Sequence, residues 1–567
     1  MRTPTLLGTI GGVNGATVSV RLSESATSGI ALIGGRSYRL GQVGGFVRIP
    51  QGYHDLYGIV SEVGAQAIPH PDSSVEQLGE RWMTVQLVGE VVEVEFERGI
   101  SQYPSINDEV HLVTESDLSK IYGSASNGRI QIGRLSNAES IPVSLDLDKL
   151  ITRHAAILGS TGSGKSTAVA SLLRSICDPL LGNFQSARIL LIDIHGEYGD
   201  ALADISKVLR ALPDEGGEQL HIPYWALQPA KVIEFLMGRI SDGQEAAVLE
   251  KIYAYKEQYA VANNPIGVNI DAMTVDTPLP YSLRRLWYEL IDNETRTWAD
   301  KAQTQPANID EGDAAELRAP RYTPPGAGPA PPFLGSGRQN IQRQLSNMRS
   351  RLLDRQFDFL FKPGVWSPNL NGETTADLSA LLEEWIGHDA PITVLDLSGV
   401  PSEILLEMIG GILTIIYEAL FWARRRPEGG RSRPQLVVLE EAHRYLGKGS
   451  ANPAAGIVQR IVKEGRKFGI GGLIVSQRPS EIDETILSQC GTFLALRLSN
   501  SSDRSHVRSA LPDNLAGVVD ALPVLRTGEA VVVGEAAPMP VRCRMTLATG
   551  SRRPSGGDPD VSERWHQ

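Results

Sequence analysis

The sequence of 567 residues is poor in cysteine. Its three cysteines, Cys177, Cys490 and Cys543, lie far apart, and none belongs to a CxxC motif or a Cys/His cluster. This scarcity excludes a disulfide framework and gives no sign of a zinc site. Small, buried apolar side chains in a reducing compartment are the better interpretation of these three residues.

The sequence also lacks any run that approaches about 20 consecutive apolar residues, the length that a membrane-spanning helix requires. Its first residues, MRTPT, do not have the apolar centre of a secretory signal. We therefore expect a cytoplasmic protein with no membrane association.

An excess of positive charge is absent too, with 66 acidic against 54 basic residues and a formal net charge of −12. This excludes a protein that coats nucleic acid through bulk charge, because phosphate binding needs a local excess of Lys and Arg. Any contact with nucleic acid must be local. At about 100 to 200 residues per domain, the length predicts three or four structural units.

Two patterns of apolar residues divide the chain. Up to residue 135, short alternating runs separated by glycine pairs are typical of strands joined by tight turns, and they predict a small β-barrel. From about residue 150, continuous apolar runs alternate with helical stretches, which predicts an α/β unit with a mostly parallel sheet. These runs are 187–194, 392–397, 435–439, 472–476 and 492–498.

The strongest motif is a complete GxxxxGK[ST], or Walker A, sequence between an apolar strand-like run and a helix-like stretch. In this setting, turns that glycine permits aim N–H groups at phosphate oxygens, and the helix start adds partial positive charge. Lys165 is expected to contact the β and γ phosphates of ATP, and Ser166 to bind Mg²⁺. The motif consists of Gly159, Ser160, Thr161, Gly162, Ser163, Gly164, Lys165 and Ser166, and it continues with Thr167.

A second acidic motif, LVVLEEAH, follows at residues 436–443. A carboxylate at the end of a buried strand is where a Walker B residue holds the Mg²⁺ shell, and a second carboxylate can polarise the attacking water. We assign Glu440 to the metal and Glu441 to the general base. The alternative is a solvated acidic pair at a strand end.

The next predicted strand ends in Ser-Gln-Arg-Pro at residues 476–479, so Gln477 is a candidate sensor of the γ-phosphate at the carboxyl edge of the sheet. Before that strand, Arg466 and Lys467 stand together in a turn. We expect Arg466 to act as an arginine finger in the site of a neighbouring subunit. The alternative is a charge pair at a helix C-terminus. Competitors for the finger are Lys467, Arg478 and Arg497.

Weaker signals concern accessory residues and DNA contacts. Asp193 and Glu197 lie at the end of the strand that follows the P-loop helix, where a structural role is favoured, and Arg153 is similarly ambiguous. Two basic segments are alternatives for gripping DNA phosphates, although a run of charge is usually a solvated surface. They are the arginines 424–426, 431 and 433, and the loop 447–450.

In combination these motifs resemble the HerA family of hexameric DNA-translocating ATPases, in the FtsK/HerA group. The resemblance is carried by residues 153–166, 193–198, 440–445, 464–469, 476–479 and 525–534, and by 44–47 and 87–90 in the first part. Ile194 stands where the family usually has proline. The resemblance implies a RecA-like P-loop ATPase core of the ASCE type, with an N-terminal small β-barrel of the HAS type and a helical insertion.

We therefore expect five segments. They are an N-terminal β-barrel for partner docking at 1–135, the first part of the ATPase core with Walker A at 136–200, a helical insertion at 201–390 with a disordered Pro-rich loop near 303–337, the second part of the core with Walker B, sensor and arginine finger at 391–548, and a disordered tail at 549–567.

The resemblance also implies a homo-hexamer that binds ATP and Mg²⁺ between subunits and threads double-stranded DNA through its channel. Its barrel face would dock an effector: a NurA-like nuclease in DNA-end processing, or a Sir2-like NADase or other defence nuclease in antiphage defence. No nuclease constellation stands out in this sequence, so we expect a DNA translocase or helicase whose partner supplies the effector chemistry. The alternative is an ATP-gated ring scaffold that regulates an effector without moving along DNA. A membrane-anchored pump is disfavoured.

Overall fold

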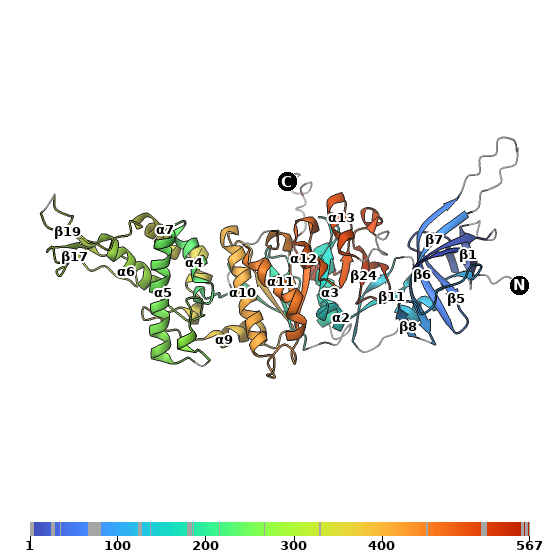
Figure 1. Ribbon diagram of the computed structural model, residues 1–567, viewed down its shortest axis with the longest axis horizontal. Helices are drawn as coiled ribbons and strands as arrows, with labels where there is room; N and C mark the ends of the chain where they lie inside the picture. Colours follow the sequence, from blue (N-terminus) through green and yellow to red (C-terminus); the bar gives the residue numbers. More distant parts are fainter. Residues whose placement is uncertain are drawn as a thin grey trace.

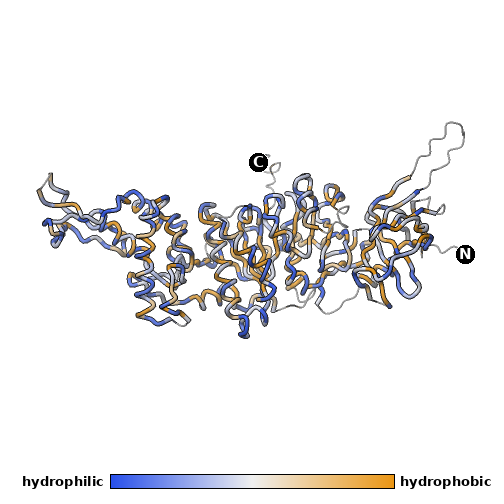
Figure 2. The backbone as a smooth tube through the Cα atoms, in the orientation of Figure 1, coloured by the Kyte–Doolittle hydropathy of each residue, from blue (hydrophilic) through white to orange (hydrophobic). Residues whose placement is uncertain are grey.

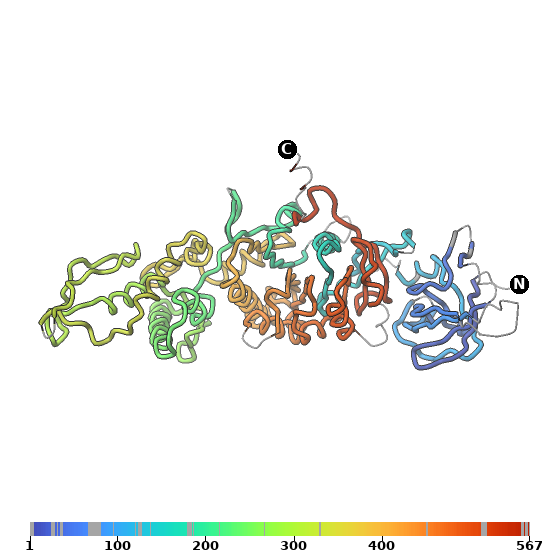
Figure 3. Tube along the Cα trace, turned by 90° about the horizontal axis from the view of Figure 1, so that it is seen from above, coloured from blue at the N-terminus to red at the C-terminus, as the bar shows by residue number. Residues whose placement is uncertain are grey.

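The computed structural model describes residues 5–556 apart from 24–28, 34–35, 66–80, 94, 123–127, 137, 178–183, 185, 215, 266, 328–329, 449–451 and 512–518, together with 561 and 565. Three parts lie in a row along the molecule (Figure 1). A barrel lies at one end, a large sheet with its helices in the middle, and a helical part at the other end. The view from above in Figure 3 shows the same order.

The N-terminal barrel closes because β7 pairs with both β6 and β2. Its strands run in the order β2-β1-β9-β5-β6-β7, and β8 is added beside β7. The side chains that fill it alternate along the strands, as the sequence pattern predicts. The small β-barrel is therefore confirmed. Its strands are β1 Leu6–Asn14, β2 Thr17–Leu22, β5 Phe46–Pro50, β6 His54–Ala65, β7 Arg81–Val92, β8 Glu95–Arg98 and β9 Glu109–Leu112. The hairpin β3 Ile30–Ile33 with β4 Arg36–Arg39 lies outside this sheet.

The central part is a 12-stranded sheet in the order β11-β10-β25-β24-β23-β12-β22-β21-β13-β20-β14-β15. From β23 to β15 all neighbouring strands are parallel, and the four strands from β11 to β24 are antiparallel. The strands are β10 Arg129–Leu135, β11 Ala138–Asp146, β12 Ala155–Leu158, β13 Ile189–Asp193, β14 Ser206–Arg210, β15 Glu218–Gln219, β20 Ile392–Asp396, β21 Gln435–Leu439, β22 Ile470–Ser476, β23 Thr492–Ala495, β24 Glu529–Gly534 and β25 Val541–Met545.

The parallel strands are apolar throughout because both faces of the sheet are covered. Along β12, Ala156 and Leu158 belong to one hydrophobic cluster, whereas Ala155 and Ile157 belong to the other. Figure 2 shows apolar segments following these strands and the helices beside them. The α/β P-loop core is therefore confirmed. Its helices are α2 Leu147–Thr152, α3 Lys165–Cys177, α10 Ser402–Trp422, α11 Pro453–Glu464, α12 Glu484–Ser488 and α13 Ser501–Ala510, with α1 Glu115–Tyr122 preceding the core.

By length and composition, α10 is apolar enough to cross a membrane, and it is the one such helix among the described residues. The sequence interpretation did not single it out. Three glutamates, Glu403, Glu407 and Glu418, interrupt its apolar residues. Its buried side chains, among them Ile409 and Leu413, belong to the hydrophobic cluster of the core.

Strands outside the predicted core limits join the large sheet. β10 lies inside the stretch 1–135 that was assigned to the barrel, but it pairs with β25 of the ATPase sheet. β14 and β15 lie inside the predicted insertion 201–390, yet β14 pairs with β20. Both limits are wrong for the same reason. The sequence of a short or alternating strand does not show which sheet the strand joins.

The helical insertion is confirmed as a unit on the far side of the sheet from the barrel (Figure 1). Its long helix α5 begins with a capping box formed by Ser241 and Gln244 and ends at Asn264 in the left-handed conformation. Trp287 on α6 donates its indole N–H to the carbonyl of Leu345 on α7, at 2.9 Å. The helices are α4 Pro229–Met237, α5 Asp242–Asn263, α6 Leu283–Thr295, α7 Gln342–Leu353, α8 Asp358–Phe361 and α9 Leu378–Leu382.

The Pro-rich segment near 303–337, predicted to be disordered, belongs to a nested hairpin with an outer and an inner strand pair, which extends from α6 and α7 (Figure 1). β16 Thr297–Trp298 pairs with β19 Phe333–Leu334, and β17 Asn308–Asp310 pairs with β18 Arg321–Tyr322. Leu317 between them is fully buried, and its carbonyl accepts a hydrogen bond from Arg349 Nε at 2.7 Å. The prediction of disorder is wrong because these contacts come from distant helices.

The predicted tail 549–567 is ordered at its start. A short 3₁₀ helix spans Gly550–Arg552, and the Ser555 N–H donates to the carbonyl of Glu197 at 3.1 Å. Most of the remaining tail, 557–560, 562–564 and 566–567, lies outside the described residues. All three cysteines are buried and free.

One arginine of the barrel contacts the ATPase sheet. The guanidinium of Arg98, at the end of β8, donates to the carbonyls of Gly534, Ala537 and Pro538, with 2.9 Å to Pro538. Gly534 is the last residue of β24, and the other two residues lie in the connection between β24 and β25. Arg98 therefore fixes the barrel to that hairpin.

We expect Leu317→Ala to loosen the Pro-rich hairpin, because deleting a buried leucine side chain costs about 2 to 5 kcal/mol. Trypsin should then cleave the native protein after Arg318 and Arg321 faster than it cleaves the wild type. Ile309→Ala is the matched control, since Ile309 is 59% exposed on the same hairpin. Equal cleavage of all three proteins would contradict an ordered hairpin.

Candidate functional site

The Walker A loop lies at the carboxyl edge of the sheet, between the end of β12 and the first residue of α3, Lys165. Gly162 and Gly164 have φ of +73° and +91°, a conformation that side chains disfavour. A Cβ on Gly164 would also come within 3.1 Å of the Gly528 nitrogen. The Gly528 N–H donates to the Ser163 carbonyl at 2.9 Å. The loop is therefore held from outside by the turn before β24.

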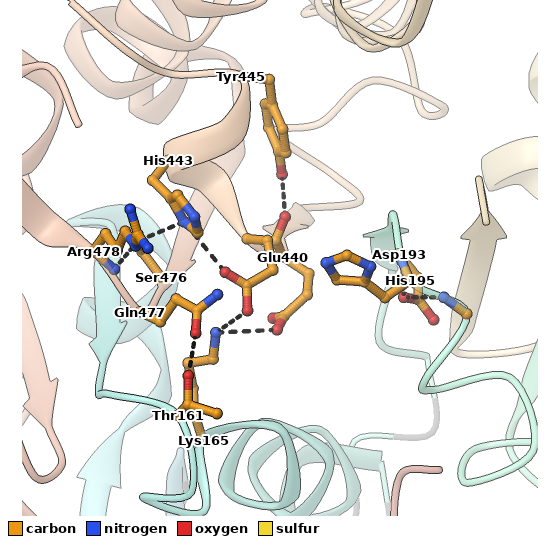
Figure 4. A network of polar contacts seen from close by, with 12 residues as sticks. Thr161, Lys165, Asp193, His195, Glu440, His443, Tyr445, Ser476, Gln477 and Arg478 are labelled. Carbon is orange, nitrogen blue, oxygen red and sulfur yellow. Dashed lines mark hydrogen bonds and ion pairs between the residues drawn. The ribbon is translucent and has the colours of Figure 1, made fainter. Parts of the chain in front are cut away.

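Lys165 points at the two carboxylates that the sequence predicts (Figure 4). Its Nζ donates to Glu441 Oε1 and lies 3.5 Å from Glu440 Oε1. All three side chains are buried. An unpaired buried charge is costly, so the ammonium and the carboxylates stabilise one another. The structure thus brings Lys165 together with two adjacent carboxylates, of which Glu441 is 276 positions away in sequence.

The two carboxylates directly follow β21 and are shaped by burial and by an unusual backbone turn. Burial raises the pKa of Glu440 to about 7, Lys165 opposes this rise, and Glu441 adds to it. The backbone of Glu441 is left-handed, with φ of +47°, which is unusual for glutamate and turns its side chain back over Lys165. The hydroxyl of Tyr445 donates to the Glu440 carbonyl at 2.8 Å and fixes this turn.

Gln477, directly after β22, contacts the P-loop. Its Oε1 accepts a hydrogen bond from the Thr161 hydroxyl at 2.7 Å. Beside it, His443 Nδ1 lies 3.2 Å from Ser476 Oγ and 3.2 Å from Glu441 Oε2. Burial lowers the pKa of His443, which favours the neutral imidazole. Adjacent strand ends are thus linked through polar side chains to the P-loop (Figure 4).

Asp193 organises a turn instead of facing the P-loop. Its carboxylate accepts from the N–H groups of His195, Gly196 and Tyr198 at 3.2, 2.9 and 2.9 Å. Burial still raises its pKa to about 6, although these hydrogen bonds oppose the rise. Glu197, in the same turn, has an Oε2 atom that is buried without a hydrogen-bond partner among the described residues.

The cations proposed as fingers separate into two groups. Arg497 donates to the Gly162 carbonyl at 3.1 Å, so it contacts the P-loop of its own chain and does not fit the role of a finger in trans. Its place follows from β23, which neighbours β12 in parallel and ends at the same edge. Arg478 is paired with Glu481 at 2.7 Å.

Arg466, Lys467 and Arg153 lie at the opposite edge of the sheet. Arg466 and Lys467 belong to a 3₁₀ helix, η8 Gly465–Phe468, which precedes β22, whereas Lys165 follows the parallel neighbour β12. The seven residues of β22 place the two edges about 20 Å apart. Arg153 and Arg466 line one cleft of about 760 Å³ between the barrel and this edge. Neither can reach the P-loop of its own chain.

The two basic segments also lie at different edges. Residues 424–433 connect α10 to the start of β21, at the same edge as Arg466. Gly447 and Lys448 follow the carboxyl end of β21, and Gly447 bridges to Ile482. Gly449 and Ser450 of that loop lie outside the described residues.

Some site residues had no role in the sequence interpretation. Thr527 donates through its hydroxyl to the Gly162 carbonyl at 3.4 Å, and Gly528 contacts Ser163. His443 and Tyr445 were quoted only as part of the acidic motif. These four residues all lie near strand ends. Sequence reasoning could connect them with the site only if the order of the strands were known.

The P-loop fits a triphosphate with Mg²⁺. Ser163 Oγ and Glu440 Oε2 are buried and have no hydrogen-bond partner among the described residues. The described part of the chain contains no group of three or more His, Cys, Asp or Glu side chains suited to a metal ion. One serine hydroxyl and one carboxylate are enough for Mg²⁺, which takes its other ligands from phosphate and water. Ser166 and Glu440 would hold the ion, and Lys165 would contact phosphate oxygens.

The parallel sheet, the glycine loop and the buried carboxylates define a P-loop ATPase. Within that class, the family model described as "Helicase HerA, central domain" matches residues 130–415, and "Helicase HerA-like C-terminal" matches residues 408–555. The chain therefore belongs to the HerA family.

Curated relatives are similar over most of their length. The chain is 24% identical to the "DNA double-strand break repair helicase HerA" of Pyrococcus furiosus, over 87% of this chain and 84% of that protein. It is 27% identical to the protein of the same name from Sulfurisphaera tokodaii, over 82% and 77%. The solved structure of VirB4 of Thermoanaerobacter pseudethanolicus is 14% identical, with a TM-score of 0.47, and the match covers 76% of this chain and 100% of that chain.

The contact between Thr161 and Gln477 predicts a specific kinetic effect. Thr161→Val keeps the shape of the side chain and removes a hydrogen bond worth about 1 kcal/mol, so kcat should fall about fivefold with little change in ATP affinity. Thr152→Val is the control, because its hydroxyl donates to Asp148 O at the other edge of the sheet. An unchanged kcat for Thr161→Val would show that the contact has no part in hydrolysis.

Proposed function

We propose that this protein is an ATP-driven translocase or helicase on double-stranded DNA, and that it acts as a ring of six copies with ATP and Mg²⁺ between them. The observation that carries the proposal is the division of the site between the two edges of the sheet. Lys165, Glu440, Glu441 and Gln477 lie at the carboxyl edge, whereas Arg466 lies at the amino edge about 20 Å away. The names of the curated relatives, DNA repair helicases, support DNA as the substrate.

Within one copy, the residues at the carboxyl edge have separate roles. Lys165 holds the β and γ phosphates, while Ser166 and Glu440 hold Mg²⁺. Glu441 accepts the proton of the attacking water, since its left-handed backbone turns the carboxylate towards Lys165. Gln477 reports the state of the γ-phosphate to β22 through Thr161.

Arg466 completes the site of the next copy. A guanidinium stabilises charge on the transferred phosphoryl group, and Arg466 is exposed at the edge opposite its own P-loop. Contact between the amino edge of one copy and the carboxyl edge of another is a head-to-tail interface, and such interfaces form a ring when the rotation from copy to copy closes. The strands of the large sheet lie side by side along the long axis of the molecule (Figure 1). The amino ends of the parallel strands therefore lie along one long side of the molecule, and the carboxyl ends along the other.

The barrel, at one end of the molecule, docks a cytoplasmic effector such as a nuclease. DNA-end processing is the role favoured by the relatives' names, and antiphage defence would use the same motor with another effector. The motor does not require a basic chain, because positive charge is needed only where DNA passes.

The central test is movement on DNA. We expect DNA to stimulate ATP hydrolysis and single molecules to advance along double-stranded DNA when ATP is present. Lys165→Ala should abolish both activities, and Glu441→Gln should retain ATP binding without turnover. A protein that hydrolyses ATP and assembles but never advances would be a scaffold, and the motor proposal would be abandoned.

The division of the site is tested by mixing two inactive variants. Arg466→Ala lacks the finger, and Glu441→Gln lacks the base, so a mixed ring contains interfaces in which an intact finger meets an intact P-loop. We expect the mixture to recover part of the ATPase rate that each variant loses. Lys467→Ala is the neighbouring control and should keep most of its activity. Absence of recovery in mixed rings would remove Arg466 from this role.

A further inference from the structure

Two basic segments meet at the amino edge of the ATPase sheet. Residues 424–433 connect α10 to β21, and residues 463–467 end α11 and form η8. Together they carry eight cations and two carboxylates, on a chain whose net charge is −12. We call their cations the basic surface: Arg424, Arg425, Arg426, Arg431, Arg433, Lys463, Arg466 and Lys467.

Close backbone packing joins the two segments into one rigid unit. Gly430 lies so near η8 that a Cβ on it would come within 2.1 Å of the Phe468 carbonyl oxygen. The Gln435 N–H donates to the Gly469 carbonyl at 2.8 Å. The Phe468 ring packs on Phe421 of α10, with ring centres 4.8 Å apart. The 424–433 segment cannot move without moving the turn that carries Arg466.

Four arginines of this surface point outward, whereas Arg424 donates to the Phe421 carbonyl at 3.2 Å. Arg425, Arg426, Arg431 and Arg433 are exposed, and none has an ion pair among the described residues. Trp422, directly before them, is 72% exposed and packs on Phe421 at 5.2 Å. Exposed tryptophan beside arginine is the composition of energetic centres in protein interfaces. The surface therefore has the chemistry of a docking site for an acidic partner.

The rigid link to Arg466 selects the partner. If Arg466 reaches a triphosphate, that triphosphate belongs to another copy, and the surface fixed to Arg466 faces the same copy. Because both segments are basic, the net charge of the rest of the chain is more negative than −12. Exposed carboxylates of Asp200, Glu481 and Glu484 follow the carboxyl ends of β13 and β22, each beside one cation of its own chain. This is the edge that a head-to-tail neighbour presents.

We infer that the basic surface, with Trp422 as its apolar anchor, docks onto the carboxyl edge of a second copy of this chain and holds Arg466 against that copy's P-loop. The inference deepens the proposed function and rests on its head-to-tail ring. It assigns the 424–433 segment to the subunit interface and not to DNA. Complementary charge also makes assembly dependent on salt.

The test reverses charge at the surface and leaves every residue of the proposed catalytic machinery intact. Arg425→Glu/Arg426→Glu should weaken self-association at least tenfold in sedimentation velocity with ATP and Mg²⁺ present, and the ATPase rate should fall with assembly. Binding of a fluorescent ATP analogue to the isolated copy should be unchanged. Trp422→Ala should weaken association to a smaller extent. The matched control is Arg343→Glu on α7, an exposed arginine far from the surface, which should assemble like the wild type.

Three results would overturn the inference. The double variant could assemble normally and lose DNA affinity in fluorescence anisotropy, which would assign the surface to DNA. It could keep both assembly and DNA binding, or the wild type could stay monomeric with ATP and DNA. Arg425→Gln/Arg426→Gln, with thermal unfolding measured, guards against misfolding and should show the same loss in weaker form. A normally assembled wild type without ATPase activity would instead contradict the proposed function.

Discussion

The parallel register of the central strands is the constraint on which the rest of the structure depends. Leu158 of β12 is level with Ser476 of β22, and Leu439 of β21 with Ile474 of β22. Every polar residue that follows one of these strands therefore arrives at one edge, and every residue that precedes one arrives at the other. A single strand length separates the phosphate loop from Arg466. In the proposed ring, the same constraint means that one copy alone does not provide a complete site, and catalysis requires assembly.

The buried cluster of Lys165, Glu440 and Glu441 stabilises this edge of the sheet. Each charge would be costly alone, and their mutual attraction reduces the cost. One buried Glu440 oxygen has no hydrogen-bond partner in the part of the chain that the structure describes. The protein thus keeps unsatisfied polarity where a ligand can satisfy it, and this is typical of a functional site.

Sequence reasoning succeeded where chemistry is local and failed where it depends on distant partners. Lys165, Glu440 and Gln477 could be predicted because each follows a recognisable apolar strand. Arg497 was a competitor of Arg466 for the role of a trans finger, but the strand order places it on its own P-loop. β10 looked like another barrel strand, because alternation does not tell which sheet a strand joins. The Pro-rich segment has a composition that predicts disorder, yet Leu317 is buried by helices far away in the sequence.

The contact of Arg98 makes the hairpin of β24 and β25 a mechanical linkage. At one end of β24, Arg98 of the barrel donates hydrogen bonds to the connection to β25. At the other end, Gly528 and Thr527 hold the carbonyls of the phosphate loop. β24, a strand of six residues, therefore joins the barrel at one end to the phosphate loop at the other. The barrel and the phosphate loop are connected through one continuous strand.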